Sequence, residues 1–188
     1  MIFTPENEDA VVLDACVLVP AALCDLLLRL AEEPAMYRPL WSEQILGEMS
    51  RALKTKLRRT AAEVAWRKQQ MCAAFPEAMV KVPAELIRAV DCIPDRNDRH
   101  VLAAAILARA DTIVTQNVKH FPKECLEKFH VTCRTADDFL VHQYHRSPQL
   151  VLDKLDDQAA CIAQERDYVI SSLQACAAEF SKLATRHL

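Results

Sequence analysis

Three carboxylates stand where predicted strands and helices begin or end. Asp14 closes the apolar run Val11–Leu13, Glu48 lies at the edge of an apolar helix stripe, and Asp98 directly precedes the apolar run Val101–Ala105. Three inward-facing carboxylates repel one another strongly unless a cation joins them. Hard oxygen donors favour Mg²⁺ or Mn²⁺, ions that promote phosphodiester hydrolysis by activating water and neutralising charge on the phosphoryl group.

Each acid also has a simpler interpretation when it is taken alone. Asp14 could cap the following helix, and Glu48 could form a salt bridge with a nearby arginine. Asp98 would be favoured by the helix dipole, with Asp95 or Asn97 as the N-cap. Asp95 itself is better explained as a cap than as a ligand. The three acids therefore point to a metal site only as a set.

The segments around these acids alternate between strand and helix patterns. Short apolar runs predict buried strands, and apolar residues at helical spacing or S/T-x-x-E/D capping boxes predict helices. This order is typical of a parallel sheet covered by helices, and therefore of an α/β fold. The predicted strands are 11–14, 112–115 and 131–133, and the predicted helices are 21–31, 43–57, 60–74, 95–110 and one that begins after Thr135.

A change of pattern follows Ser147 and Pro148, which read as an N-cap with proline at the first helical position. Two amphipathic helices are predicted beyond it, over 151–162 and 169–183. The chain is accordingly divided into a main domain, residues 1–146, and a C-terminal helical extension, residues 147–188.

Composition excludes several classes of protein. The single glycine, Gly47, leaves no means of building a P-loop or a dinucleotide-binding glycine turn. No apolar run approaches the roughly 20 residues that span a bilayer, and the acidic N-terminus is unlike a secretory signal. A cytoplasmic protein with no membrane partner is expected. Eight scattered cysteines without zinc-site spacing are expected to be reduced.

The charge distribution leaves two interpretations open. A net charge of -3 excludes a general nucleic-acid coating protein. Five basic residues nevertheless fall within the ten-residue segment Arg51–Thr60. This patch could hold a phosphate backbone or could be an ordinary solvated helix face.

Four segments together resemble the motifs of the PIN-domain family, in the family's order and spacing from about Val11 to Phe139. The segments are Val12–Leu18, Trp41–Glu48, Asp95–Ala105 and Ala110–Pro122. The helical tail resembles that of a subgroup of VapC-type toxins. The resemblance implies a three-layer α/β/α PIN-like fold with a central parallel sheet, followed by a C-terminal helical extension.

The resemblance also implies a function and a site. Asp14, Glu48 and Asp98 would be the catalytic, metal-binding carboxylates, and Thr115 and Asn117 would line the same pocket. The expected activity is Mg²⁺- or Mn²⁺-dependent endoribonucleolytic cleavage of RNA, with structured RNA such as tRNA as the substrate. The chain would act as the toxin of a type II toxin–antitoxin pair, form a homodimer and be silenced by a cognate antitoxin.

The chain departs from the family pattern at three positions. His120 stands where relatives often carry a further acid, Asn117 is also neutral, and Asn97 replaces a common aspartate. A site with fewer acids would bind metal more weakly or hold one ion instead of two. The alternative is a catalytically degenerate PIN module that binds RNA or a protein partner without cleavage. His120 could be a ligand, a proton carrier or a hydrogen-bonded structural histidine.

Overall fold

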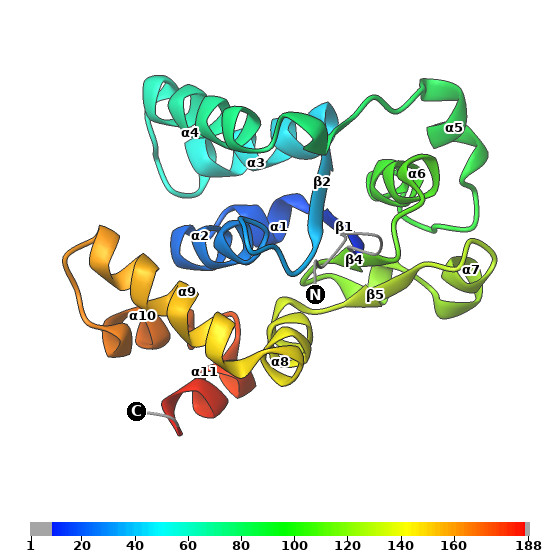
Figure 1. Cartoon of the computed structure of the whole chain (residues 1–188). Coiled ribbons are helices and arrows are strands. Elements are labelled where there is room, and N and C mark those ends of the chain that lie inside the picture. Colours follow the sequence, from blue (N-terminus) through cyan, green and yellow to red (C-terminus); the bar gives the residue numbers. More distant parts are fainter. Residues whose placement is uncertain (1–8, 187–188) are drawn as a thin grey trace.

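In the computed structural model, which describes residues 9–186, five short strands form one parallel sheet (Figure 1). The strand order is β3-β2-β1-β4-β5, so the first strand of the chain lies at the centre. The strands are β1 (Ala10–Leu13), β2 (Arg38–Ser42), β3 (Met79–Val80), β4 (Thr112–Val114) and β5 (Thr132–Arg134). Because all pairs are parallel, the carboxyl ends of the strands meet at one edge of the sheet.

Strands β1, β4 and β5 were predicted from the sequence, whereas β2 and β3 were not. In β2, Pro39 pairs with Val11 but cannot donate a ladder hydrogen bond, so this segment carries a weak strand signal. Strand β3 has only two residues and is held by β2 through Trp41 and Ser42. Both strands are therefore specified by their neighbours more than by their own sequence.

Helices cover both faces of the sheet, which confirms the predicted three-layer α/β/α arrangement (Figure 1). One helix, α6, packs across one face and contacts β1, β2, β3 and β4. The helices are α1 (Ala15–Leu18), α2 (Ala21–Leu30), α3 (Glu43–Thr55), α4 (Ala61–Ala74), α5 (Ala84–Ala89), α6 (Arg99–Ala108), α7 (Lys123–Glu127), α8 (Ala136–Arg146), α9 (Pro148–Cys161), α10 (Arg166–Leu173) and α11 (Ala178–Thr185), with 3-10 turns η1 (Pro76–Ala78) and η2 (Val118–His120). None of the helices between residues 9 and 186 is long and apolar enough to cross a membrane.

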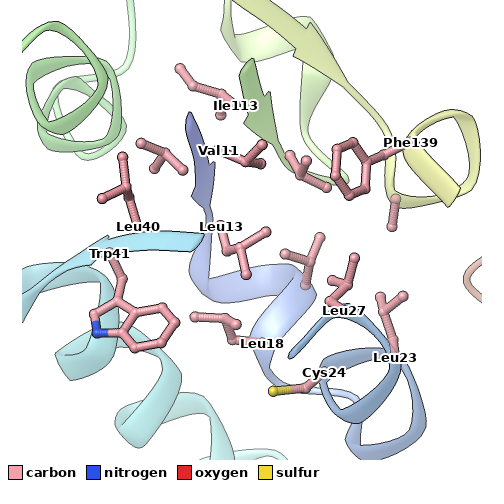
Figure 2. Packing of buried hydrophobic residues seen from close by; sticks show 14 of the residues in the cluster. Val11, Leu13, Leu18, Leu23, Cys24, Leu27, Leu40, Trp41, Ile113 and Phe139 are labelled. Atoms are coloured by element: carbon pink, nitrogen blue, oxygen red, sulfur yellow. The ribbon is translucent and has the colours of Figure 1, made fainter. Parts of the chain in front are cut away.

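The core is built around β1, whose four residues are all buried. A strand covered on both faces needs an unbroken apolar sequence, and Ala10–Leu13 supplies one. Figure 2 shows how side chains from the neighbouring elements gather around this strand. They include Leu40 and Trp41 from β2, Ile113 from β4, Leu18 from α1, Leu23 and Leu27 from α2 and Phe139 from α8.

Three of the predicted helix starts are confirmed by their capping contacts. The Ser42 hydroxyl accepts a hydrogen bond from the backbone N–H of Ile45 at 3.2 Å. Thr60 and Glu63 form a complete capping box at the start of α4. The Thr135 hydroxyl accepts from the Asp138 N–H at 3.0 Å and starts α8. Each of these contacts is local in sequence, and local contacts are what a sequence motif can predict.

Two predicted helix boundaries were wrong. The helix expected from Asp95 begins at Arg99, because residues 95–98 form a separate turn in which the Asp98 N–H donates to the Asp95 carbonyl at 3.1 Å. The apolar stripe of α3 was extended to Leu57, but α3 ends at Thr55 and Leu57 is 49% exposed.

Within residues 9–186, four residues other than glycine have left-handed backbone conformations. Arg58, Arg109, His130 and Ala163 have φ angles of 52°, 52°, 56° and 52°. Arg109 is the C-cap of α6, a position that glycine usually occupies. The only glycine, Gly47, lies inside α3 instead.

The residues after Arg146 form α9, α10 and α11, and α9 packs along α2. The buried Lys154 side chain donates to the carbonyls of Glu32 and Glu33 at 3.3 and 3.2 Å. Gln158 donates to the carbonyl of Ala22 at 2.9 Å. Polar side chains of α9 therefore satisfy the carbonyl groups of α2 and of the segment after it, which fixes the position of α9.

The single helix predicted over 169–183 is divided into α10 and α11. The Asp137 carboxylate, from the first turn of α8, accepts hydrogen bonds from the backbone N–H groups of Glu179 and Phe180 at 3.0 and 2.8 Å. This contact caps the start of α11 from outside. Because the capping residue lies about forty positions earlier in the chain, periodicity within the tail could not predict the break.

Replacing Asp137 with alanine should therefore lower the free energy of unfolding by about 1–2 kcal/mol, because two helix N–H groups lose their acceptor. Chemical denaturation measures this loss, and Asp137→Asn should recover part of it because the amide oxygen still accepts. Asp157→Ala, at an exposed position on α9, is the matched control. Equal stabilities for Asp137→Ala and Asp157→Ala would contradict the capping role.

Candidate active site

The candidate site lies at the carboxyl edge of the sheet, where β1 and β4 end side by side. Asp14 directly follows β1 and Thr115 directly follows β4. The Asp14 N–H donates to the Val114 carbonyl at 3.0 Å, and the Thr115 N–H donates to the Arg134 carbonyl at 3.0 Å. The parallel ladder thus continues to these residues and brings their side chains together.

Asp14 is a buried carboxylate, 5% exposed, whose two oxygens both accept hydrogen bonds. Its Oδ1 accepts from the Ala15 N–H at 2.6 Å, which is the capping contact that the sequence allowed. Its Oδ2 accepts from the Thr115 hydroxyl at 2.6 Å. The capping and the site interpretations of Asp14 are therefore compatible, and the predicted proximity of Asp14 and Thr115 is observed.

Cys16 also belongs to this site, although its apolar surroundings in the sequence suggested only a packing role. Its Sγ donates to Oδ2 of Asp14 at 3.1 Å and lies 3.3 Å from the Thr115 hydroxyl. The Gln116 N–H in turn donates to the sulfur at 3.2 Å. Burial, reinforced by the Asp14 carboxylate, raises the pKa of the Cys16 thiol to about 12, so at neutral pH the group remains a donor.

A second group of side chains comes from the turn before α6 and from η2. Ligand atoms of Asp95, Asp98 and His120 all lie within 4.8 Å of one another. His120 Nδ1 is 2.7 Å from Oδ2 of Asp98. The 3-10 turn that presents His120 is closed by its N–H, which donates to the Asn117 carbonyl at 2.8 Å. Two carboxylates and an imidazole at this separation can share one divalent ion.

Asp95 belongs to this group, but it is not the helix N-cap that the sequence suggested, because α6 begins at Arg99 and Asp98 occupies the N-cap position. Oδ1 of Asp95 accepts from the Asn97 N–H at 2.9 Å, which stabilises the turn. Its proximity to His120, 25 residues later in the chain, was not predicted. An Asx-type turn has a local sequence signal, whereas the approach of η2 depends on the fold.

The acidic residues influence one another electrostatically. Partial burial raises the pKa of Asp98, and the carboxylates of Asp95 and Asp14 raise it further, while His120 acts in the opposite direction. Asp14 and Asp98 are thus close enough for their charges to interact, as expected of carboxylates around one site. A cation bound between them would relieve this repulsion.

Glu48 makes its own contact with α6. Its Oε1 lies 3.0 Å from Nε2 of His100, whose side chain is 1% exposed, whereas the Glu48 side chain is 29% exposed. The sequence suggested an arginine as the partner of a structural Glu48, and the structure provides His100. Among residues 9–186, the three-residue group that could hold an ion does not include Glu48 or Asp14.

Asn117 contributes to the site through its backbone. Its N–H donates to the Thr115 hydroxyl at 3.1 Å, and this hydroxyl in turn donates to Asp14. No hydrogen bond engages the Asn117 side chain within the described part of the chain. Asn117 therefore orients Thr115, while a pocket-lining role of its amide stays a prediction.

A disulfide joins the two segments that carry the group formed by Asp95, Asp98 and His120, called the Asp95 group below. Cys92, three residues before Asp95, is bonded to Cys125 in the middle of α7, five residues after His120. The expectation that all cysteines are reduced was wrong for this pair, because residues 33 positions apart are brought together only by the fold. The other cysteines, Cys16, Cys24, Cys72, Cys133, Cys161 and Cys176, are free.

The comparison with known families supports this assignment of the fold. A family model described as "PIN domain" matches residues 10–119, which is more than half of the chain. The chain belongs to the PIN-domain family. The match contains Asp14, Glu48, Asp98, Thr115 and Asn117, and it ends one residue before His120.

A shorter match links this PIN domain to a curated protein. A protein named "Putative ribonuclease VapC50", from Mycobacterium tuberculosis (strain ATCC 25618 / H37Rv), is 52% identical over 46 residues. The match covers 24% of this chain and 27% of that protein. The predicted resemblance to VapC-like PIN domains is therefore confirmed, although this chain matches only about a quarter of the relative's length.

The donor set fits a divalent metal ion. Asp95, Asp98 and His120 offer two carboxylates and one imidazole, and the charge of Asp14 lies within reach of the same space. Oxygen donors suit Mg²⁺ and Mn²⁺, and the imidazole shifts the preference toward Mn²⁺. The residues that would hold the ion are therefore Asp95, Asp98 and His120.

Binding of Mn²⁺ should depend on His120 and on pH. Because the pKa of Asp98 is raised, protons should begin to compete with Mn²⁺ at a higher pH than at an ordinary aspartate. His120→Ala should weaken Mn²⁺ affinity by about tenfold and move this pH dependence further upward, since His120 favours the ionised carboxylate. Thermal shift titrations between pH 5 and pH 8 measure both effects. His142→Ala on α8 is the control, and equal Mn²⁺ responses in the two variants would contradict the assignment.

Proposed function

We propose that this PIN-domain protein is a metal-dependent endoribonuclease. The observation that supports this most strongly is the group formed by Asp95, Asp98 and His120, together with the Asp14 carboxylate at the end of β1, whose charge acts on Asp98. That edge is where ligands bind in open parallel sheets. The similarity to a protein named as a ribonuclease supports RNA as the substrate, and structured RNA such as tRNA is the class we propose.

The side chains of the site would have distinct roles. A divalent ion bound here would activate water and neutralise charge on the phosphoryl group. Asp95, Asp98 and His120 would bind the ion, with Nδ1 of His120 lying 2.7 Å from Oδ2 of Asp98. Thr115 and Cys16 donate to Oδ2 of Asp14 and so fix its orientation. Buried donors of this kind keep a carboxylate in place before substrate arrives.

Glu48 has a less direct place in this proposal. Its carboxylate is held by His100 and remains partly exposed, so it could also contribute charge to the site. Glu48 lies outside the group of Asp95, Asp98 and His120, but the PIN-domain motifs imply a metal-binding role for it, and His100 would position its carboxylate for that role. Asn117 would act mainly through the Thr115 hydroxyl, to which its N–H donates.

We further propose that the chain acts as the toxin of a toxin–antitoxin pair, as its VapC-like motifs imply. Its partners would be a cognate antitoxin and a second copy of the chain. Residues 1–146 would form the nuclease domain, and residues 147–188 would form the helical extension. The observed contacts of α9 with α2, and of α11 with α8, support an extension that packs on the domain.

A cleavage assay tests the enzymatic proposal directly. The purified full chain is incubated with tRNA, single-stranded RNA and single-stranded DNA, each with Mn²⁺, Mg²⁺ or EDTA. The expected result is internal cleavage of RNA that requires Mn²⁺ or Mg²⁺. Cleavage that persists in EDTA, or cleavage of DNA alone, would contradict the proposal.

The alternative function is a module that binds RNA or a protein without cleaving it. It is favoured by His120 and Asn97, which stand where relatives often carry acids, and by the neutral side chain of Asn117. Tight RNA binding without cleavage under any of the metal conditions would support this alternative. Metal-dependent RNA cleavage would exclude it.

A further inference from the structure

A cavity of about 790 Å³ opens beside the candidate site, at the ends of β2 and β3. It is lined by the start of α3, by the segment that runs from β3 to α5, and by His100 of α6. Its volume falls within the range of pockets that bind small molecules or single ligand groups. Because β2 lies next to β1 in the sheet, the cavity shares the carboxyl edge that carries Asp14.

His100 connects this cavity to the acidic residues. The side chain forms part of the cavity wall, and its Nε2 lies 3.0 Å from Oε1 of Glu48. A group bound in the cavity would therefore contact a residue that is itself bonded to Glu48. The cavity is a neighbouring compartment of that site, not a remote surface feature.

The walls of the cavity combine apolar faces with a polar rim. Met79, Val82, Pro83 and Ile87 supply the apolar faces. Gln44 and Lys81 are exposed at the rim, and neither side chain forms a hydrogen bond or ion pair within the described residues. The other charged residue of the lining, Glu43, is already paired with Lys68. The charge left available at the rim is therefore the positive charge of Lys81.

We propose that this cavity binds one unstacked base of a single-stranded RNA segment adjacent to the cleaved phosphodiester, an inference that rests on the proposed ribonuclease function. Proteins read single-stranded RNA by holding unstacked bases, most often on aromatic rings or arginine planes, and by hydrogen bonds to the base edges. In this cavity aliphatic side chains would take the place of the aromatic ring. Here Met79, Val82, Pro83 and Ile87 enclose the base, and the Gln44 amide offers both a donor and an acceptor to its edge. Lys81 contacts the backbone phosphate that leads to the site.

A nucleotide fits these features better than a peptide does. An apolar peptide side chain would use the same walls, but it would leave Lys81 and the Gln44 amide without partners. A base linked to a phosphate uses all three features and places the chain of the substrate toward Glu48 and Asp98. The cavity thereby selects substrates in which at least one nucleotide near the cleavage point is unpaired.

The test combines removal of single bases from an RNA oligonucleotide with substitution of the cavity wall. At one nucleotide position, replacing the base by an abasic ribose should raise KM for the wild-type protein by about tenfold. In Ile87→Gln, which replaces an apolar wall with an amide, the same abasic substitution should change KM by less than about twofold, because the base contact is already lost. Leu86→Gln, at the adjacent position of α5 outside the cavity lining, should keep the full tenfold effect.

Substitutions of Lys81 and Gln44 at the rim of the cavity provide a second test, which does not depend on the apolar wall residues. Lys81→Ala should raise KM for every oligonucleotide equally and reduce its salt dependence, whereas Lys128→Ala should not. Gln44→Ala should alter the preference among the four bases, with Gln69→Ala on α4 as the control. Equal base-removal effects in wild type, Ile87→Gln and Leu86→Gln would overturn the base-binding proposal alone. Absence of RNA cleavage by the wild-type protein would instead contradict the proposed function from which it follows.

Discussion

Asp14→Asn and Asp98→Asn should each lower the rate of RNA cleavage by about a hundredfold or more. Each substitution removes one negative charge from the space in which a divalent ion would be held. The interaction of Asp14 with Asp98 means that neither charge acts independently of the other. Single-turnover cleavage of labelled RNA at saturating Mn²⁺ measures the chemical step, and a Mn²⁺ titration separates weaker ion binding from slower chemistry.

The same two substitutions should affect stability in different ways. Because the folded state raises the pKa of Asp98, ionised Asp98 is less favourable in the folded than in the unfolded chain. Its contribution to the free energy of unfolding is therefore unfavourable at neutral pH and disappears as the pH falls below the unfolded-state pKa. Without metal, Asp98→Asn should leave the protein as stable as wild type or slightly more stable. Asp14→Asn should cost about 1 kcal/mol, because the buried carboxylate accepts from Ala15, Thr115 and Cys16.

This combination distinguishes a catalytic from a structural role of Asp98. If Asp98 served only to start α6, Asp98→Asn would lower the stability of the protein and leave the rate of cleavage unchanged. Its side chain makes no capping hydrogen bond, which already favours the other outcome. Asp157→Asn serves as a control for both measurements. Undiminished cleavage by both site variants would remove the basis for placing catalysis at this edge of the sheet.

The second large effect concerns the disulfide between Cys92 and Cys125. Replacing both residues with serine should lower the free energy of unfolding by about 3–4 kcal/mol, since the bond closes a loop between residues 33 positions apart. The loop contains Asp95, Asp98, Thr115 and His120, so local opening of this segment should also weaken Mn²⁺ binding. Denaturation with and without Mn²⁺ measures both consequences.

A reducing agent gives an independent version of this experiment. Dithiothreitol should destabilise the wild-type protein and leave the Cys92→Ser, Cys125→Ser variant unchanged. Cys72→Ser, which alters a free and partly buried cysteine, should respond to the reducing agent as wild type does. If the wild-type protein were equally stable in oxidised and reduced form, the bond would have no role in holding the Asp95 group.

Sequence patterns predicted the parts of the fold that depend on neighbouring residues. The run Val11–Leu13 was recognised as a buried strand, and the capping boxes at Thr60 and Thr135 located two helix starts. The missed strands β2 and β3 are short or contain proline, and pairing with neighbours defines them. The division of the tail at α11 likewise depends on Asp137 from α8. Tertiary contacts therefore determine the strands and helix boundaries that the local sequence pattern did not predict.

The same distinction applies to the candidate site. Asp14 and Thr115 follow the ends of two strands, so their proximity could be predicted from the order of elements. The pairing of Glu48 with His100 joins residues 52 positions apart, and the approach of His120 to Asp98 joins residues 22 positions apart. The sequence around His100 or His120 does not indicate which carboxylate the histidine will contact. Cys16 was overlooked because a thiol among apolar residues is ordinarily a packing residue.

The scarcity of glycine has a consequence for how this protein can change. Arg58, Arg109, His130 and Ala163 hold left-handed conformations that cost a residue with a Cβ atom about 1 kcal/mol each. The fold therefore contains backbone strain that a single glycine codon could relieve at any of these positions. Such substitutions would act as general suppressors, restoring stability to variants weakened elsewhere, including Asp14→Asn. The protein could therefore tolerate destabilising substitutions in its candidate active site when they are combined with such a glycine substitution.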